Sequence, residues 1–292
     1  MSDLVPAHLD HRRVWRDFDY CYPVLSRRSR GLSLGVNLNP DKVCNFDCVY
    51  CEVDRLSPPV RRDVDVDQMG QELELLLDLA VSGGIYDIPP FDSALPGQRR
   101  LNDIAFSGDG EPTTAREFPG AVARAAALKR ARDLDDVKLV LITDASRLQA
   151  PEVVQGLEIL MANQGEIWAK LDAGTEAYYR EICRSRVPFA RILDNLLVAA
   201  RRWGIVLQTL FLSWQGRGPD DRELGAYADR VQAILEQGGR INALQLYTVA
   251  RPTPEPEARP LRRLQMDAIA ANLRSRFPGL AIEVYYGPEE WA

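Results

Sequence analysis

The stretch Cys44-Asn-Phe-Asp-Cys48-Val-Tyr-Cys51 is the segment that decides the fold of this chain. It follows an apolar run, Leu32–Leu38, with the composition of a buried strand. The spacing C-x3-C-x2-C brings three thiolates onto one short loop. Three thiolates suit a cluster of four irons in which one iron has no protein ligand. We therefore predict that Cys44, Cys48 and Cys51 are metal ligands.

A zinc site is the alternative for such a loop. Structural zinc takes four ligands, commonly two Cys pairs or a Cys pair and a His pair. The chain offers only His8 and His11, both far upstream, so the spacing favours iron. Of the remaining cysteines, Cys183 is expected in the core. Cys21, between two tyrosines, is expected there too, with a place near the cluster as the alternative.

Short apolar runs alternate with amphipathic segments through most of the sequence, which is typical of βα units around a parallel sheet. The expected strands are Leu32–Leu38, Asp103–Ser107, Lys138–Thr143, Ile167–Asp172, Ile205–Leu212 and Leu244–Val249. The expected helices are Gln68–Ala80, Phe118–Arg132, Pro151–Met161, Thr175–Ile182, Ile192–Trp203 and Asp221–Gln237. Six such units predict an α/β fold, an open (βα)6 partial barrel with its active site at the C-terminal ends of the strands.

Three regions are expected along the chain. Residues 1–30 are polar and arginine-rich and are interpreted as an N-terminal extension, and residues 31–250 form the partial barrel. Residues 251–292 begin with a proline-rich loop, because four prolines between positions 251 and 260 exclude a regular helix or a central strand. A C-terminal helix, Leu261–Phe277, and a short strand, Ala281–Tyr286, follow that loop.

The cysteine spacing, with the aromatic Tyr50 before the last Cys, resembles the signature of the radical S-adenosylmethionine (SAM) superfamily. The segments G-L-S-L-G-V-N-L-N-P, S-G-D-G-E-P-T, W-A-K-L-D-A and Q-L-Y-T-V-A-R-P are similar to a small bacterial subgroup of that superfamily, which looks like the radical domain of the tRNA wyosine-base synthases. The resemblance covers roughly residues 30–290. It implies the partial barrel and an enzyme that cleaves SAM at a [4Fe-4S] cluster to form a 5'-deoxyadenosyl radical, which abstracts hydrogen from substrate.

The resemblance also assigns cofactor contacts. SAM would chelate the fourth iron through its amino and carboxylate groups. The Gly108-Asp109-Gly110-Glu111 segment would contact the amino group through main-chain carbonyls and a carboxylate, because glycines allow close approach of the backbone. Thr143, Asp144 and Ser146 suit the ribose or the methionine carboxylate, although they equally suit a cap for the helix beginning near Pro151. Tyr50 is expected among the same contacts.

Period two in the strand ending at Asp172 places Trp168, Lys170 and Asp172 on one face. A lysine inside a barrel needs an anion, so Lys170 is predicted to bind the carboxylate of SAM or of a substrate. Asp172 would be its ion-pair partner or a ribose contact. Three side chains are expected towards the substrate, Gln208 and Gln245 as buried amides and Tyr247 as a hydroxyl. Arg251, just past the last strand, could clamp a carboxylate or phosphate.

The composition limits which partners and which cellular location are expected for this chain. The net charge of -6 excludes a global basic field for nucleic acid, so an RNA substrate would need local arginine groups such as Arg61 and Arg62. Arginine accounts for 32 of the 36 basic residues. The apolar runs are too short for a membrane span, and five thiols suit a cytoplasmic protein. The expected partners are an electron donor such as flavodoxin or ferredoxin and a substrate that is a tRNA base, a peptide or a small metabolite. A non-catalytic iron-sulfur redox protein is the other alternative.

Overall fold

The computed structural model describes residues 5–9, 13, 15–59 and 61–288. His11, considered above as a zinc ligand, lies outside these residues. The chain forms two compact units, each assembled from three segments. The first unit contains residues 1–44, 55–143 and 150–166, and the second contains residues 45–54, 144–149 and 167–292. No helix in the described residues is long and apolar enough to cross a membrane.

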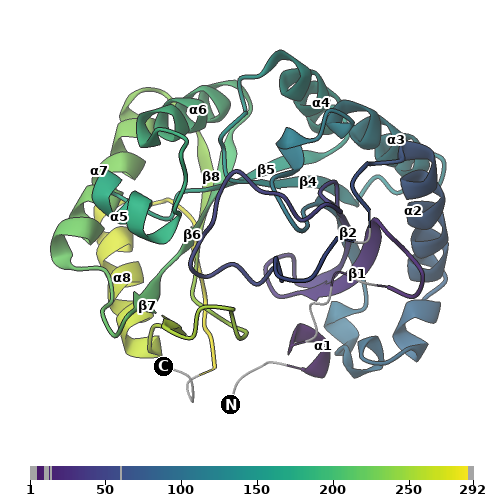
Figure 1. Cartoon of the computed structure of the whole chain (residues 1–292), viewed down its shortest axis with the longest axis horizontal. Coiled ribbons are helices and arrows are strands. Elements are labelled where there is room, and N and C mark those ends of the chain that lie inside the picture. The colour runs from purple at the N-terminus through teal and green to yellow at the C-terminus, as the bar shows by residue number, and fades with distance from the viewer. Residues whose placement is uncertain (1–4, 10–12, 14, 60, 289–292) are drawn as a thin grey trace. The chain divides into compact units, whose positions relative to one another are not determined.

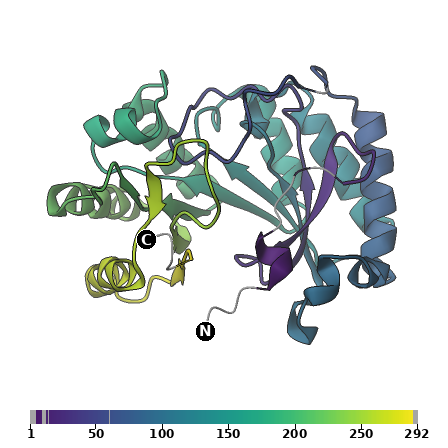
Figure 2. The ribbon, with the colours of Figure 1, turned by 60° about the horizontal axis from the view of Figure 1, so that its bottom comes forward.

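The first unit is built on strands that hydrogen-bond in sequence order: β1 (Cys21–Ser26), β2 (Gly31–Val36), β3 (Leu101–Phe106) and β4 (Lys138–Thr143). β1 runs antiparallel to β2, and the other pairs are parallel. Its helices are α1 (Pro6–Leu9), α2 (Val66–Val81), α3 (Phe118–Arg130) and α4 (Pro151–Met161), with short 3-10 turns η1 (Gly84–Asp87), η2 (Phe91–Ser93), η3 (Pro96–Gln98) and η4 (Pro112–Thr114). Helices α2, α3 and α4 lie side by side along the strands of this unit (Figure 2).

The second unit repeats the alternation of strand and helix. β5 (Gly165–Lys170) enters it at Ile167, and β6 (Ile205–Leu210), β8 (Ile241–Tyr247) and β10 (Ile282–Tyr285) follow in parallel. The helices are α5 (Glu176–Ile182), α6 (Phe189–Arg202), α7 (Asp221–Glu236) and α8 (Arg263–Arg276), labelled in Figure 1. A small antiparallel pair, β7 (Leu212–Trp214) and β9 (Ala258–Pro260), forms a separate sheet.

The predicted α/β class is confirmed, with parallel strands connected by helices. Each predicted strand and helix has a counterpart within a few residues, and α4 has the predicted bounds. One strand was predicted too long. The apolar run Ile205–Leu212 breaks after Leu210, and Leu212 starts β7 instead, paired with β9 in the proline-rich segment.

β1 is an element that the sequence analysis did not predict. Its start is fixed by Glu72 of α2, a buried carboxylate that accepts the main-chain N–H groups of Asp19, Tyr20 and Cys21 at 2.8–3.0 Å. Pro23 lies within β1, which is tolerated because β1 pairs only with β2 and is an edge strand. The Cys21 thiol is buried and donates to the Met69 carbonyl oxygen at 3.5 Å, which agrees with the core position predicted for it.

Candidate functional site

The cysteine loop connects β2 to α2 and carries three partly exposed thiols. Cys44 belongs to the first unit, and Cys48 and Cys51 belong to the second. The N–H of Cys51 donates to the carbonyl oxygen of Cys48 at 2.9 Å, which closes a tight turn between them.

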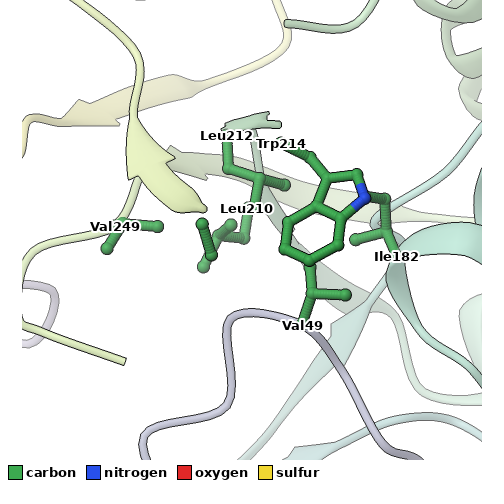
Figure 3. Close-up of a cluster of buried hydrophobic side chains, with 7 residues drawn as sticks. Val49, Ile182, Leu210, Leu212, Trp214 and Val249 are labelled. Carbon is green, nitrogen blue, oxygen red and sulfur yellow. The ribbon is translucent and has the colours of Figure 1, made fainter. Parts of the chain in front are cut away.

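Val49 anchors this loop in the second unit. Its side chain is fully buried in an apolar cluster with Ile182, Leu210, Leu212, Trp214, Val249 and Ala258. Figure 3 shows Val49 and Ile182 beside the ring of Trp214. The backbone is held as well, because Val49 N–H donates to the Ile182 carbonyl at 2.9 Å and Asp47 N–H donates to the Cys183 carbonyl at 3.1 Å. The last carbonyls of a helix lack intrahelical partners, so the cysteine loop serves as the C-terminal cap of α5.

These main-chain hydrogen bonds lie on both sides of Cys48 and hold the loop beside Cys183. The neighbouring Cys183 side chain lowers the pKa of Cys48. The neighbouring Cys48 side chain, together with burial, raises the pKa of Cys183. Cys183 is 2% exposed, as predicted for a core residue, but its contact with Cys48 was not predicted.

The chemistry of the donor set fits a [4Fe-4S] cluster. The three predicted ligands are cysteine thiols, the ligand type that iron-sulfur clusters take, and none forms a disulfide. In the described residues no group of three or more His, Cys, Asp and Glu side chains is gathered as a metal site. The assignment of Cys44, Cys48 and Cys51 as ligands therefore rests on their spacing in the sequence.

Glu111 lies at the centre of a buried polar group in the first unit. It is 3% exposed, and its Oε1 accepts hydrogen bonds from Thr113 Oγ1 at 2.5 Å and Thr143 Oγ1 at 2.7 Å. The same oxygen accepts the N–H of Thr113 at 3.2 Å, which makes Glu111 the N-cap of η4. The structure thus brings together two predicted residues, Glu111 and Thr143. The hydroxyl groups of Thr113 and Thr143 hold the Glu111 carboxylate in one orientation.

Asp109 is held by side chains that the sequence analysis did not select. Its carboxylate pairs with Arg13 Nη1 at 3.2 Å and accepts from Asn37 Nδ2 at 2.8 Å. Its carbonyl oxygen accepts from Arg55 Nη1 at 3.2 Å. Asn37 lies in the N-L-N-P segment after β2, which is one of the segments that carry the family resemblance, so the sequence could have identified it. Nothing in the sequence pointed to Arg13.

The two glycines of this segment are required by close packing. A Cβ on Gly108 would meet Asn37 Oδ1 at 2.2 Å, and a Cβ on Gly110 would meet the Val43 carbonyl oxygen at 2.2 Å. Gly110 therefore packs against the residue that precedes Cys44. This close approach explains the two glycines without a ligand.

Asp144 and Ser146 belong to the second unit and contact the cysteine loop there. Asp144 Oδ1 accepts the N–H of Ser146 at 2.8 Å across Ala145, which has a positive φ of 66°. Asn45, the residue after Cys44, donates from Nδ2 to Ser146 Oγ at 2.6 Å. The alternative that these residues cap the following helix is wrong, because the N-cap of α4 is Ala150.

Lys170 and Asp172 form the predicted ion pair, with Nζ and Oδ2 3.2 Å apart. Lys170 Nζ also donates to Tyr247 Oη at 2.5 Å and lies 4.9 Å from the ring centroid of Tyr50. Asp172 accepts Tyr50 Oη at 2.5 Å and the N–H of Leu210 at 2.8 Å. Burial alone would lower the pKa of Lys170, but Asp172 and Tyr247 raise it above its ordinary value. The ammonium form is therefore the stable one.

A polar row crosses four neighbouring strands from Lys170. In register, Lys170 pairs with Gln208, Gln208 with Gln245, and Gln245 with Glu283 on β10. Gln208 Nε2 donates to Gln245 Oε1 at 2.8 Å, and Gln245 Nε2 donates to Glu283 Oε2 at 3.1 Å. Both amides are buried and hydrogen-bonded, as buried amides generally are. Glu283 extends this row beyond the residues predicted from sequence.

Arg251 lies next to the cysteine loop within the second unit. Its Nε donates to Glu52 Oε2 at 2.8 Å, and Glu52 follows Cys51 directly. The arginine groups suggested for RNA are partly engaged within the protein. In the first unit Arg61 pairs with Asp19 at 3.0 Å.

No family model matches the sequence. A protein of Brachyspira hyodysenteriae named GTPase Obg is 24% identical over 254 residues, which are 84% of this chain and 32% of that protein. A UPF0026 protein of Helicobacter pylori is 30% identical over 138 residues, 47% of this chain and 38% of that protein. The chain spans 32% to 53% of the length of the curated relatives it matches. It contains no G-x4-G-K-S/T phosphate-binding motif, so the GTPase name is not transferred.

Solved structures show the fold. A radical SAM methyltransferase from Sphaerobacter thermophilus superposes with a TM-score of 0.61 at 15% identity and covers 90% of this chain and 68% of that one. A structure of TYW1 with a lysine-pyruvate adduct bound has a TM-score of 0.54 at 13% identity and covers 90% and 78%. At these identities the likeness shows that the chain shares its fold with these two structures.

Proposed function

We propose that this chain is a radical SAM enzyme in which Cys44, Cys48 and Cys51 hold a [4Fe-4S] cluster. The observation that carries the proposal is the cysteine loop. It presents three thiols, anchors Val49 in an apolar cluster and caps α5, on a chain with the radical SAM fold. A reduced cluster with bound SAM supplies methionine and a 5'-deoxyadenosyl radical that abstracts a hydrogen atom from substrate.

Glu111 is our candidate for the residue that binds the ammonium group of the methionine part of SAM. Its carboxylate is buried and held in one orientation by Thr113 and Thr143, so binding a cation there needs little rearrangement. A buried carboxylate also gains more from a cationic partner than an exposed one does, because water screens the pair less. The main-chain carbonyls of Gly108 and Gly110 provide the further acceptors that an ammonium group requires.

Lys170 is our candidate for an anion contact in the second unit, either the carboxylate of SAM or an acidic group of the substrate. Asp172 and Tyr247 hold its ammonium group in place between the rings of Tyr50 and Tyr247. Asp172 is in turn fixed by the Leu210 N–H. Such a lysine positions an anion and does not act as an amine nucleophile, because it retains its proton.

The substrate we propose to test first is a tRNA base, because the sequence motifs resemble the radical domain of the tRNA wyosine-base synthases. A peptide or small metabolite is the alternative. Comparison of modified nucleosides and metabolites from cells with and without this chain separates the two.

Anaerobic reconstitution with iron and sulfide, followed by dithionite and SAM, tests the reaction class. We expect 5'-deoxyadenosine and methionine in equal amounts from the wild-type protein. Cys44→Ala, Cys48→Ala and Cys51→Ala should lose both the cluster and the cleavage, whereas Cys21→Ala should retain both, since Cys21 bonds to Met69 in the core of the first unit. An intact cluster that yields no 5'-deoxyadenosine would show a redox protein instead. Reduced flavodoxin or ferredoxin should replace dithionite.

A further inference from the structure

We propose that Tyr178 donates a hydrogen bond to the anion that Lys170 binds, so that the two side chains form one site for an oxyanion such as a carboxylate. The inference rests on the proposed function, because it deepens the anion contact assigned there to Lys170. Tyr178 lies on α5, outside every motif that the sequence analysis selected.

The hydroxyl group of Tyr178 is buried without a protein partner. Its oxygen atom has no hydrogen bond to any group in the described residues. An unsatisfied buried hydroxyl is costly, and a native structure that keeps one calls for an explanation. The six other tyrosines of the second unit all form hydrogen bonds through their hydroxyl groups: Tyr50, Tyr179, Tyr227, Tyr247, Tyr285 and Tyr286.

The fold holds Tyr178 in its position. Helix α5 begins after the N-cap Thr175, whose hydroxyl oxygen accepts the Tyr178 N–H at 3.2 Å. Glu223 of α7 is buried and holds Thr175 in turn, because its carboxylate accepts the Thr175 N–H at 3.1 Å and the Thr175 hydroxyl at 2.6 Å. The cysteine loop caps the other end of α5. Both ends of the short helix are therefore fixed within the second unit.

Tyr178 and Lys170 are neighbours of the same group of side chains. The rings of Tyr50, Tyr178 and Tyr247 all pack against the apolar cluster that contains Trp214. Two of these rings flank Lys170, whose Nζ lies 4.9 Å from the ring centroid of Tyr50 and 5.1 Å from that of Tyr247. Tyr178 is thus the third tyrosine around this cluster, and its hydroxyl is the one without a partner.

The available groups of both side chains are donors, which defines the class of ligand. Lys170 has three N–H groups. Asp172 and Tyr247 engage two of them, and the third has no acceptor among the described residues. Burial, followed by the nearby carboxylates of Glu223 and Asp172, raises the pKa of Tyr178, so its hydroxyl keeps its proton at neutral pH. An ammonium group and a hydroxyl donor together suit an anion whose oxygen atoms accept hydrogen bonds.

Thermal unfolding of the full-length, cluster-free protein in sulfate and in chloride of equal ionic strength tests the site. Sulfate is the probe because its oxygen atoms accept hydrogen bonds, and its general effect on stability is common to all variants. Tyr178→Phe should bind sulfate about tenfold more weakly than the wild type, as expected for the loss of a hydrogen bond to a charged group.

Without sulfate, Tyr178→Phe should unfold at a higher temperature than the wild type, because it no longer buries an unpaired hydroxyl. A hydroxyl with a purely structural bond would give the opposite change. Tyr179→Phe on the same helix loses such a bond, to the Val187 carbonyl at 3.0 Å, and should lower the midpoint temperature at unchanged sulfate affinity. Tyr86→Phe removes an unpaired buried hydroxyl in the first unit and should stabilise the protein at unchanged sulfate affinity.

S-adenosylhomocysteine identifies the source of the natural anion, since it carries the same carboxylate as SAM. Competition with sulfate on the reconstituted protein would assign the site to SAM, and simultaneous binding would assign it to the substrate; either result supports the site. If sulfate binds Tyr178→Phe as tightly as the wild type, or stabilises the wild type no more than Tyr178→Phe, the inference is wrong while SAM cleavage stands. An intact cluster that does not cleave SAM would overturn the proposed function instead.

Discussion

Lys170 shows how a single residue constrains the chemistry available to this chain. The neighbour TYW1 has been solved with a lysine-pyruvate adduct, and an adduct of that kind requires a neutral amine. In this chain the Lys170 ammonium is paired with Asp172 and bonded to Tyr247, and its pKa is raised. A protonated Lys170 is consistent with the anion contact proposed for it.

We expect no lysine adduct at Lys170 when the protein is incubated with pyruvate and borohydride at neutral pH. The raised pKa leaves the neutral amine populated only under alkaline conditions, above the ordinary lysine range. Mass spectrometry of peptides should show the same background labelling in the wild type and in Lys170→Ala. Labelling that depends on Lys170 at neutral pH would contradict the ammonium assignment.

Asp103 is a second residue whose charge has a measurable consequence. It lies buried on β3, where it accepts a hydrogen bond from Ser33, and burial raises the pKa of its carboxyl to about 6. The folded state therefore binds the proton more tightly than the unfolded state, so stability falls as the pH rises from about 4 to about 6.

Asp103→Asn should stabilise the protein at pH 8 by about 3 kcal/mol, because the pKa is raised from 3.8 to about 6, one pKa unit corresponds to about 1.4 kcal/mol, and the amide can still accept from Ser33. Below about pH 4 the gain should vanish, because both states then hold the proton. Urea unfolding of the cluster-free protein at several pH values measures the difference. Asp136→Asn, at an exposed position, should show no such pH dependence, and a gain that is independent of pH would exclude ionisation of Asp103 as its cause.

At the scale of elements, the cysteine loop depends on α5 and on the apolar cluster around Trp214. We predict that Val49→Asp sharply lowers the iron content after reconstitution, because a charge cannot be buried beside Ile182 and Trp214 without a partner. Val43→Asp makes the same change in the same loop at a side chain that is 62% exposed, and it should retain the iron. Equal iron in the two variants would show that the anchor is dispensable.

The elements themselves were largely predictable from sequence. Apolar runs of strand length and amphipathic segments predicted β2 to β6, β8 and the long helices, because those patterns follow from burial on known faces. β1 was not predicted, since Pro23 and the tyrosines around Cys21 obscure its pattern. β7 and β9 have three residues each, too few to show a period. Their pairing depends on tertiary contacts.

The site was predictable where residues lie at the ends of consecutive strands. Glu111 with Thr143, and Lys170 with Asp172, meet within the same unit as expected, because neighbouring parallel strands end at the same edge. Arg13, Cys183 and Glu283 were missed. Arg13 contacts Asp109, a residue 96 positions away, and no local pattern carries such a distance. The metal-ligand assignment stays a prediction from the spacing.

At the scale of the whole molecule, the chain passes repeatedly between its two units. Boundaries after residues 44, 54, 143, 149 and 166 leave neither unit as one continuous stretch. A cut at the last boundary, after residue 166, therefore yields a fragment that lacks the two loop segments of its own unit. Residues 167–292 alone would lack Val49 and both N–H groups that cap α5.

We predict that the fragment 167–292 does not unfold cooperatively. It exposes the Trp214 cluster and leaves the last carbonyls of α5 without partners, and both effects are destabilising. Circular dichroism during urea titration should show a broad change for the fragment and a sharp transition for the full chain. A sharp transition for the fragment would show that the loop adds nothing essential to the second unit.

The bond from Ser185 to Asn45 joins residues 140 positions apart, which has a consequence for how the protein is made in the cell. The ribosome releases the three cysteines long before it has synthesised α5. At about 5–20 residues per second, the interval is roughly 7–28 s. During that time the α5 carbonyls that hold Asp47 and Val49 are absent, and the thiols of the loop are open to oxidation and to competing metals. Iron delivery is therefore expected to follow synthesis of α5, and slow translation before Ser185 should lower the fraction of protein that receives its iron.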